Sequence, residues 1–193
     1  FASGVSGVFG PTIHMRVAEG NDIKTLDDIF IRVGRIQFYV VSLVLIGYLS
    51  IGQDFVKIWA GEDYQDAYYI GLMLMISIFV PSTQSVGLEI QKALNMHKSR
   101  SLVYFFAALV NVVLTIPLSQ LWSGLGAAFA TMICMLLGSG LFMNYYYWKR
   151  IGLDIPKFFK SIVSIMPGLV FPAGVGYAIK CFANIDSFMG IFL

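Results

Sequence analysis

Long apolar stretches without a charged side chain make up most of this chain. Charge-free runs cover residues 36–53, 67–88, 101–148 and 161–179, after an uncharged opening run over 1–15. A helix that crosses a membrane needs about 20 predominantly apolar residues. The longest run would be about 72 Å long as one helix, more than twice the ~30 Å hydrocarbon core, so it must fold back on itself. The pattern predicts an all-α bundle of transmembrane helices.

Turn-forming residues divide the longest run near Trp122, where they favour a tight reversal between two antiparallel helices. The residues of this cluster are Pro117, Ser119, Gln120, Ser123, Gly124 and Gly126. The predicted crossings then lie near residues 1–17, 36–53, 67–91, 101–118, 125–148 and 161–180, within a single transmembrane domain over 1–193. The first crossing is truncated, which leaves five complete ones. Residues 183–193 are apolar enough to begin another.

Two of the polar connections carry patterns of short surface helices. In residues 21–35 the apolar positions recur at helical spacing, and Thr25 with Asp28 matches a capping box, so a short interfacial helix is predicted there, the alternative being a solvated loop. Asp154 and Pro156 have the composition of a helix start. A second surface helix is therefore expected just before the last crossing.

Composition excludes a water-soluble globule. The chain has 193 residues, of which 58% are hydrophobic and only 12% charged, against about 25% charged in an ordinary soluble domain. The net charge of +2 is too small to indicate a nucleic-acid partner. Cys134 and Cys181 lie in separate apolar stretches, without another metal-ligating residue at the right spacing. With no catalytic constellation in the sequence, we expect no enzyme, no metal and no cofactor.

The basic residues are distributed unequally between the two sides of the predicted bundle. Of thirteen Lys and Arg residues, all but Lys57 and Lys180 fall in connections on one side. These are Arg16, Lys24, Arg32, Arg35, Lys92, Lys98, Arg100, Lys149, Arg150, Lys157 and Lys160. Because Lys and Arg in short loops stay in the cytoplasm, this side is predicted to be cytoplasmic. The protein is expected to cross the membrane several times.

Polar side chains inside the predicted crossings are the candidate functional residues, because such groups are costly in hydrocarbon. At 100° per residue, Ser77, Gln84 and Gln91 lie within about 40° of one another on the third crossing, with Ser85 and Glu89 on an adjoining sector. Such a stripe suits a helix that lines a water-filled cavity, or one that hydrogen-bonds its neighbours. The candidate cavity-lining residues are Ser77, Gln84, Ser85, Glu89, Gln91, Asn111 and Thr115.

Three further residues have competing interpretations. Glu89 is the only acidic residue in a predicted crossing and could bind a coupling proton or cation, but Lys92 follows at ion-pair spacing on the same helix. His14 and Arg16 end the first helix at the cytoplasmic boundary, where they are candidates for a substrate entrance. A snorkelling arginine beside an interfacial histidine is the alternative for that pair.

A succession of short motifs extends over residues 9–160. They are Gly10-Pro11 with the mixed-charge loop after it, the loop KIWAGEDY at 57–64 with Ala67, the stretch 91–98, NVVLTIPL at 111–118 and GLGAAFAT at 124–131. In this order the motifs resemble the C-terminal half of polysaccharide biosynthesis membrane proteins. These are the Wzx-type oligosaccharide (O-antigen) flippases of the MATE-like multidrug/oligosaccharidyl-lipid/polysaccharide superfamily.

The resemblance implies a transporter of the bacterial cytoplasmic (inner) membrane, built from two helical lobes around a central cavity. It implies a polyprenyl-diphosphate-linked glycan as substrate and alternating access as the transport cycle. This chain would supply most of one lobe and would need the N-terminal lobe of the same protein as its partner. An ion-coupled small-molecule or multidrug antiporter of the same superfamily, and a membrane scaffold that transports nothing, are the alternatives.

Overall fold

The structure, a computed structural model, describes residues 2–20 and 23–182, and the apolar stretch 183–193 lies outside this part. Of the described residues 94% are helical and none lies in a strand. The long helices are α1 (Ala2–Ala18), α2 (Ile23–Ala60), α3 (Gln65–Thr83), α4 (Ser85–Ala93), α5 (His97–Met135), α7 (Ile155–Ile165) and α8 (Val170–Phe182). Short segments between them are η1 (Glu62–Tyr64), η2 (Leu136–Phe142), α6 (Met143–Tyr146), η3 (Tyr147–Ile151) and η4 (Met166–Leu169).

Helix α2 joins the predicted interfacial helix to the predicted crossing at 36–53. Its 38 residues contain no proline, so nothing interrupts the backbone hydrogen bonds between the two. At 1.5 Å per residue α2 is about 57 Å long, which exceeds the ~30 Å hydrocarbon core. Part of α2 must therefore extend beyond the core into the headgroup region.

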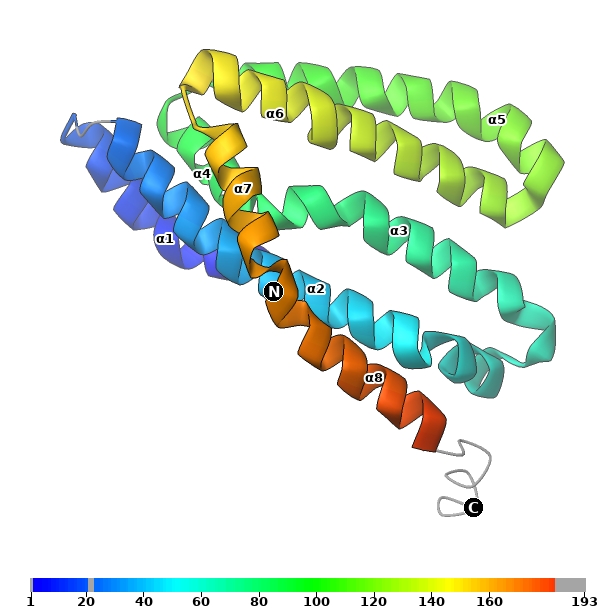
Figure 1. Cartoon of the computed structure of the whole chain (residues 1–193). Helices are drawn as coiled ribbons and strands as arrows, with labels where there is room; N and C mark the ends of the chain where they lie inside the picture. Colours follow the sequence, from blue (N-terminus) through cyan, green and yellow to red (C-terminus); the bar gives the residue numbers. More distant parts are fainter. Residues whose placement is uncertain (1, 21–22, 183–193) are drawn as a thin grey trace.

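The long apolar run at 101–148 does fold back, as predicted. The chain reverses at Trp122 and Ser123, whose backbone angles are not helical, and the returning limb continues from α5 through η2, α6 and η3. A side chain at Gly126 would collide with the backbone carbonyl of Leu118, so only glycine lets the two limbs approach this closely. The result is the helical hairpin at the upper edge of Figure 1.

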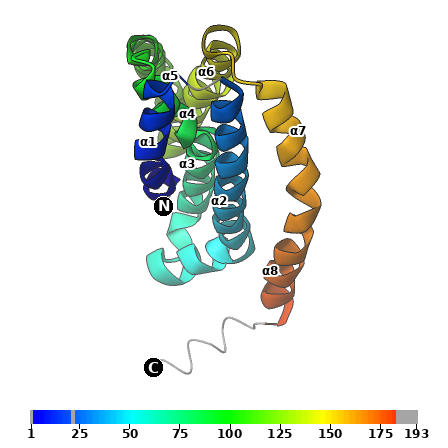
Figure 2. The same cartoon turned by 90° about the vertical axis from the view of Figure 1, so that its left-hand side faces the viewer.

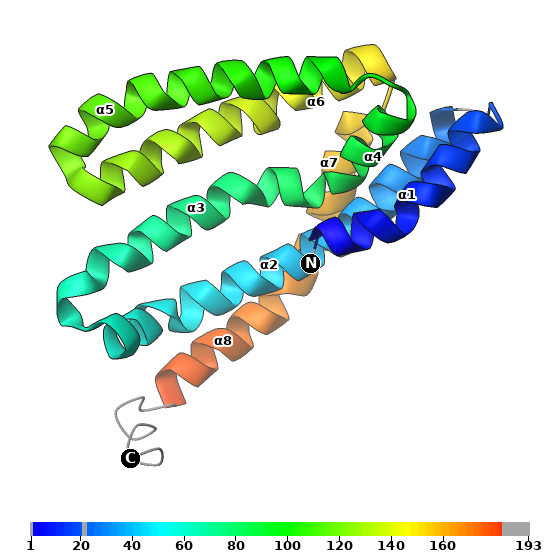
Figure 3. The same cartoon turned by 180° about the vertical axis from the view of Figure 1, so that it is seen from behind.

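The helices lie side by side, and their connections gather at two ends. We call the end of the bundle that holds the loop at Gly61 and the reversal at Trp122 the turn end. The opposite end, where the connections after α1, α4 and η3 lie, is called the basic end (Figure 1). α2 contacts α3, and α3 contacts the α5 hairpin. Figure 2 shows α7 and α8 along one side of α2, and Figure 3 shows α1 in front of the first part of α2 and beside α4, both of which it contacts.

The buried core lies at the basic end of the bundle. Phe30 of α2 is fully buried between Phe158 of α7 and Tyr147 of η3, with ring centroids 4.7 and 6.2 Å away. Ile13 and Ile90 are also fully buried and bring α1 and α4 into the same cluster. By contrast, the hairpin exposes a continuous apolar surface, as lipid-facing helices do.

Four stretches of the described chain are long and apolar enough to cross a membrane: 23–60, 62–83, 98–151 and 155–178. Several such helices are typical of a multi-pass membrane protein. The predicted count of five complete crossings and one truncated crossing is not confirmed. α1 has only 17 residues, and the stretch 98–151 is a single apolar segment that holds both limbs of the hairpin.

The second predicted helix start, at Asp154, is confirmed by α7, whereas its position on the membrane surface stays a prediction because residues 155–178 together are long and apolar enough to cross. The N-cap of α7 is Asp154, whose side chain accepts a hydrogen bond of 3.0 Å from the backbone N–H of Lys157, and Pro156 stands in the first turn. One face of α7 is buried against α2 through Phe158 and Ile162, while Phe159 stays exposed. α7 is thus an amphipathic helix docked on the first half of α2.

The assignment of the two ends to opposite sides of the membrane can be tested by labelling. In a background with Cys134 and Cys181 replaced by Ser, we expect Glu62→Cys to react with a membrane-impermeant maleimide from outside the cell. Lys149→Cys should react only after permeabilisation. Val113→Cys, about 13 Å from the reversal along α5, should not react in either case because it faces hydrocarbon. Labelling of Glu62→Cys and Lys149→Cys from the same side would contradict the assignment.

Candidate functional site

Buried side-chain amides connect four helical segments near the basic end. Gln84 donates a hydrogen bond of 2.7 Å from its Nε2 to Oδ1 of Asn144 on the returning limb of the hairpin. Gln37 of α2 donates from its Nε2 to Oγ of Ser85 at 2.6 Å. Asn144 also donates to the carbonyl oxygen of Gly140 at 2.6 Å. We call Gln37, Gln84, Ser85 and Asn144 the amide layer.

The residues of the amide layer lie at similar distances from the turn end. Measured at 1.5 Å per residue from Ala60, Gln65 and Ser123, Gln37, Gln84 and Asn144 lie about 35, 29 and 32 Å along their helices. This spacing matches the ~30 Å thickness of the hydrocarbon core. With the turn end placed at one boundary of the hydrocarbon core, the amide layer falls near the other boundary, on the basic side.

The sequence predicts one helix over residues 67–91, but in the structure this helix is broken at the amide layer. α3 ends at Thr83, Gln84 has non-helical backbone angles, and α4 begins at Ser85. Pro81 contributes to the break because it cannot donate a backbone hydrogen bond in the last turn of α3. Gln84 thus lies at a discontinuity, with its side chain bonded to another helix.

The other candidate cavity-lining residues also have partners within the bundle. Ser77 donates to the carbonyl of Leu74 on its own helix at 2.6 Å. Gln91 is fully buried and donates to the carbonyl of Met96 at 3.0 Å. On the hairpin, the side chains of Asn111, Thr115 and Thr131 are linked by hydrogen bonds of 2.8 and 3.3 Å. These contacts are of the helix-bonding kind, and a cavity-lining role for this group stays a prediction.

Glu89 forms an ion pair with Lys92, the partner that its spacing in the sequence predicted. Its Oε1 lies 3.0 Å from Lys92 Nζ, and its side chain packs beside Gly10 of α1. The carboxylate is therefore at the basic end, close to the α1–α4 contact, and not in the middle of a crossing.

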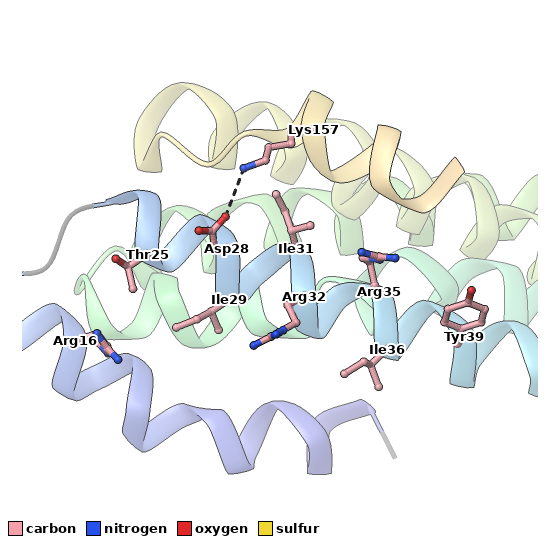
Figure 4. A pocket seen from close by; sticks show the side chains of 10 residues that line it. All are labelled: Arg16, Thr25, Asp28, Ile29, Ile31, Arg32, Arg35, Ile36, Tyr39 and Lys157. Atoms are coloured by element: carbon pink, nitrogen blue, oxygen red, sulfur yellow. Dashed lines mark hydrogen bonds and ion pairs between the residues drawn. The ribbon is translucent and has the colours of Figure 1, made fainter. Parts of the chain in front are cut away.

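A basic groove lies on the side of α2 that faces away from α3, with α1 and α7 as its walls. It has a volume of about 740 Å³. Figure 4 shows Lys157 on α7 at one side of α2 and Arg16 on α1 at the other, with Arg32 and Arg35 on α2 between them. The charged and hydroxyl side chains that line it are Arg16, Thr25, Asp28, Arg32, Arg35, Tyr39 and Lys157.

Cations outnumber acids four to one among the groove residues. Lys157 Nζ lies 3.4 Å from Asp28 Oδ1 and 3.6 Å from Asp27 Oδ2. Within the part of the chain that the structure describes, Arg16, Arg32 and Arg35 form no ion pair. The groove therefore has a strong positive potential, which favours an anion.

Asp27 connects the groove to the docking of α7. Its Oδ1 accepts a hydrogen bond of 2.9 Å from the backbone N–H of Asp154, the N-cap residue of α7. Its other oxygen faces Lys157, and the side chain is only 11% exposed. One buried carboxylate thus fixes where α7 begins and holds a groove cation in place.

Sequence reasoning found only one wall of this groove. Arg16, predicted at a cytoplasmic entrance, lines it, whereas His14 is exposed and does not. Arg32, Arg35 and Lys157 entered the sequence argument only through the sidedness of the loops. The signal for them was present, because Asp28, Arg32, Arg35 and Tyr39 recur every three to four residues and so share one helix face.

Comparisons with known proteins identify no relative. A scan against protein-family models, a search of curated proteins and a search of solved structures each found no match. Across the described residues, no group of three or more His, Cys, Asp or Glu side chains could hold a metal ion. Function must therefore be argued from the amide layer and the basic groove.

The bond between Gln84 and Asn144 should contribute to stability through coupling between the two residues. We expect Gln84→Leu and Asn144→Leu each to lower the unfolding temperature in detergent, and the double variant to lose less than the sum. Hydrogen bonds between membrane helices contribute roughly 0.5–2 kcal/mol, which sets the expected coupling energy. Additive losses in this double-mutant cycle would show that the two amides do not interact.

Proposed function

We propose that this chain forms one lobe of a bacterial inner-membrane flippase that exports lipid-linked oligosaccharide repeat units for polysaccharide biosynthesis, such as that of O-antigen. The substrate would be a polyprenyl-diphosphate-linked glycan, moved by alternating access without covalent chemistry. The lobe would work together with the N-terminal lobe of the same protein. The resemblance of the sequence motifs and the geometry at the basic end both support this proposal.

The observation that carries the proposal is the amide layer at the break between α3 and α4. Transporters commonly place discontinuous helices where the substrate passes, because unwound backbone and its flanking side chains can exchange partners. Here the residue at the break, Gln84, bonds Asn144 of the hairpin, and its neighbour Ser85 bonds Gln37 of α2. A rocking motion of the hairpin against α2 would open at least one of these two bonds, because the junction of α3 and α4 is bonded to both elements.

The chemistry of a glycan fits these groups. A sugar that leaves water loses hydrogen bonds to its hydroxyls, and this loss is costly unless new partners replace them. Side-chain amides offer both donors and acceptors to hydroxyl groups. Amides at the hydrocarbon boundary on the basic side would meet the glycan as it enters from the cytoplasm.

The proposal predicts that opening the amide layer matters for transport. The double variant Gln84→Leu with Ser85→Ala removes both interhelical bonds of the layer. We expect at least a tenfold loss of glycan export per protein molecule, measured as translocation of a labelled lipid-linked oligosaccharide into vesicles that contain the complete protein. Protein abundance in the same vesicles supplies the normalisation.

The matched control is Gln53→Leu with Ser50→Ala on α2. It makes the same two chemical changes near the turn end, where Ser50 bonds only the carbonyl of Ile46 in its own helix. Export by the control should stay within twofold of the unmodified protein. Export by Gln84→Leu/Ser85→Ala within the same range would remove the transport role of the amide layer.

The antiporter alternative is tested through Glu89. A carboxylate that couples transport to an ion must bind and release that ion inside the membrane-spanning part of its helix. Glu89 instead pairs with Lys92 at the basic end. We therefore expect Glu89→Gln to retain export within about threefold. If the variant is instead present at normal levels and transports a drug or glycan only without coupling to a proton or sodium gradient, the antiporter reading is correct.

A further inference from the structure

We propose that the basic groove between α1, α2 and α7 binds the phosphate group of an anionic lipid, and that Asp28 competes with this phosphate for Lys157. The ligand class is a phosphate or diphosphate on a hydrocarbon chain. The polyprenyl-diphosphate head of the substrate is one such ligand, and that identification alone rests on the proposed function.

The charge of the groove is what selects an anion. Arg16, Arg32 and Arg35 line the groove and form no ion pair with any of the described residues. Their positive charges repel one another, so a bound anion would relieve this repulsion. Guanidinium groups bind phosphate oxygens through two parallel hydrogen bonds, which makes arginine clusters the usual phosphate ligand. The groove thus contains the donors of a phosphate site, at its walls on α1 and α2.

The depth of the groove selects a lipid over a soluble anion. Arg35 and Arg32 lie about 38 and 42 Å along α2 from its end at Ala60. With the turn end at one boundary of a ~30 Å hydrocarbon core, both arginines fall beyond the other boundary, where headgroup phosphates lie. Ile36 lines the same groove one residue nearer the turn end than Arg35 and is half exposed. A ligand with its phosphate on the arginines could therefore keep its chain on an apolar surface. Basic pockets between membrane helices at the cytoplasmic side bind anionic headgroups in this way.

Asp28 is the internal competitor. Its carboxylate holds Lys157 at 3.4 Å, and it is the only acid that lines the groove. The two side chains are 55% and 76% exposed, so the pair is readily exchanged for another anion. Lys157 would keep its contact with the buried Asp27 during the exchange. α7 would stay docked, because Phe158 and the hydrogen bond from Asp154 to Asp27 do not involve Asp28.

The test is equilibrium binding to the purified full chain in uncharged detergent with phosphatidylcholine. Three radiolabelled probes are compared: a polyprenyl diphosphate, phosphatidylglycerol and inorganic pyrophosphate. The two lipids should bind at least tenfold more tightly than pyrophosphate, and their binding should weaken as ionic strength rises. Equal affinity for pyrophosphate would overturn the lipid assignment.

Charge-neutralising variants locate the site. Arg32→Gln with Arg35→Gln should lower lipid affinity at least tenfold. Lys24→Gln with Lys160→Gln is the matched control, because it removes two exposed cations outside the groove, one from α2 and one from α7. The control should change affinity less than threefold. Equal losses in the two variants would show that lipids respond only to the general charge of the basic end, and would overturn the site.

Asp28→Asn distinguishes competition for Lys157 from a purely structural role of Asp28, because only competition predicts tighter lipid binding. It removes the competitor while leaving Asp27, so lipid affinity should rise about three- to tenfold. Asp63→Asn, which makes the same change in net charge at the turn end of the bundle, should leave affinity unaltered. Unchanged or weaker binding by Asp28→Asn, at a normal unfolding temperature, would overturn the competition.

The outcomes separate this inference from the proposed function. A preference for polyprenyl diphosphate over phosphatidylglycerol would support the groove as a substrate site. Equal binding of both lipids would support it as a site for membrane phospholipid. Lipid binding that follows these variants in a protein that exports no glycan would uphold the groove and refute the flippase proposal.

Discussion

Hydrocarbon offers no hydrogen bonds, and this constraint organises the whole structure. The polar side chains of the amide layer are each bonded to another helix, as Gln84 and Gln37 show. The α5 hairpin, which has the most apolar surface, carries few polar groups between its reversal and Asn144. Polar groups are therefore concentrated at the basic end, and the buried core lies there too. The amide layer and the basic groove are both consequences of that placement.

Packing and charge meet at one residue, Asp27. A carboxylate that is 11% exposed would be costly without partners, and it has two: the N–H of Asp154 and the ammonium of Lys157. Removing either partner would leave a buried charge poorly compensated, so α7 is held at one position along α2. Because α7 forms a wall of the groove, the shape of the groove depends on this carboxylate. The contact of Phe158 with Phe30 adds an apolar anchor one turn further along α7.

The sequence predicted where individual helices begin and reverse better than which helices are continuous or pack against one another. The reversal at Trp122 and the start of α7 at Asp154 follow from proline, glycine and capping residues, which act over a few positions. The continuity of α2 was missed because charged residues at 24–35 indicate an interfacial segment, while no helix breaker separates them from the crossing. The groove was missed because Arg16, Arg32 and Lys157 come from three helices, and periodicity along one helix cannot show which other helix packs against it. For the same reason a polar stripe on one helix could not reveal that Asn144 would bond Gln84.

The two acids that contact Lys157 differ in how firmly they hold it. Asp27 is buried and bonded to the backbone of α7, so its position is fixed by the fold. Asp28 is mostly exposed, and water and salt weaken its attraction for the ammonium. A phosphate that enters the groove would meet Lys157 together with three arginines, whereas Asp28 meets Lys157 alone. The arrangement therefore lets a ligand displace one carboxylate while the other keeps the helix, and with it the shape of the groove, in place.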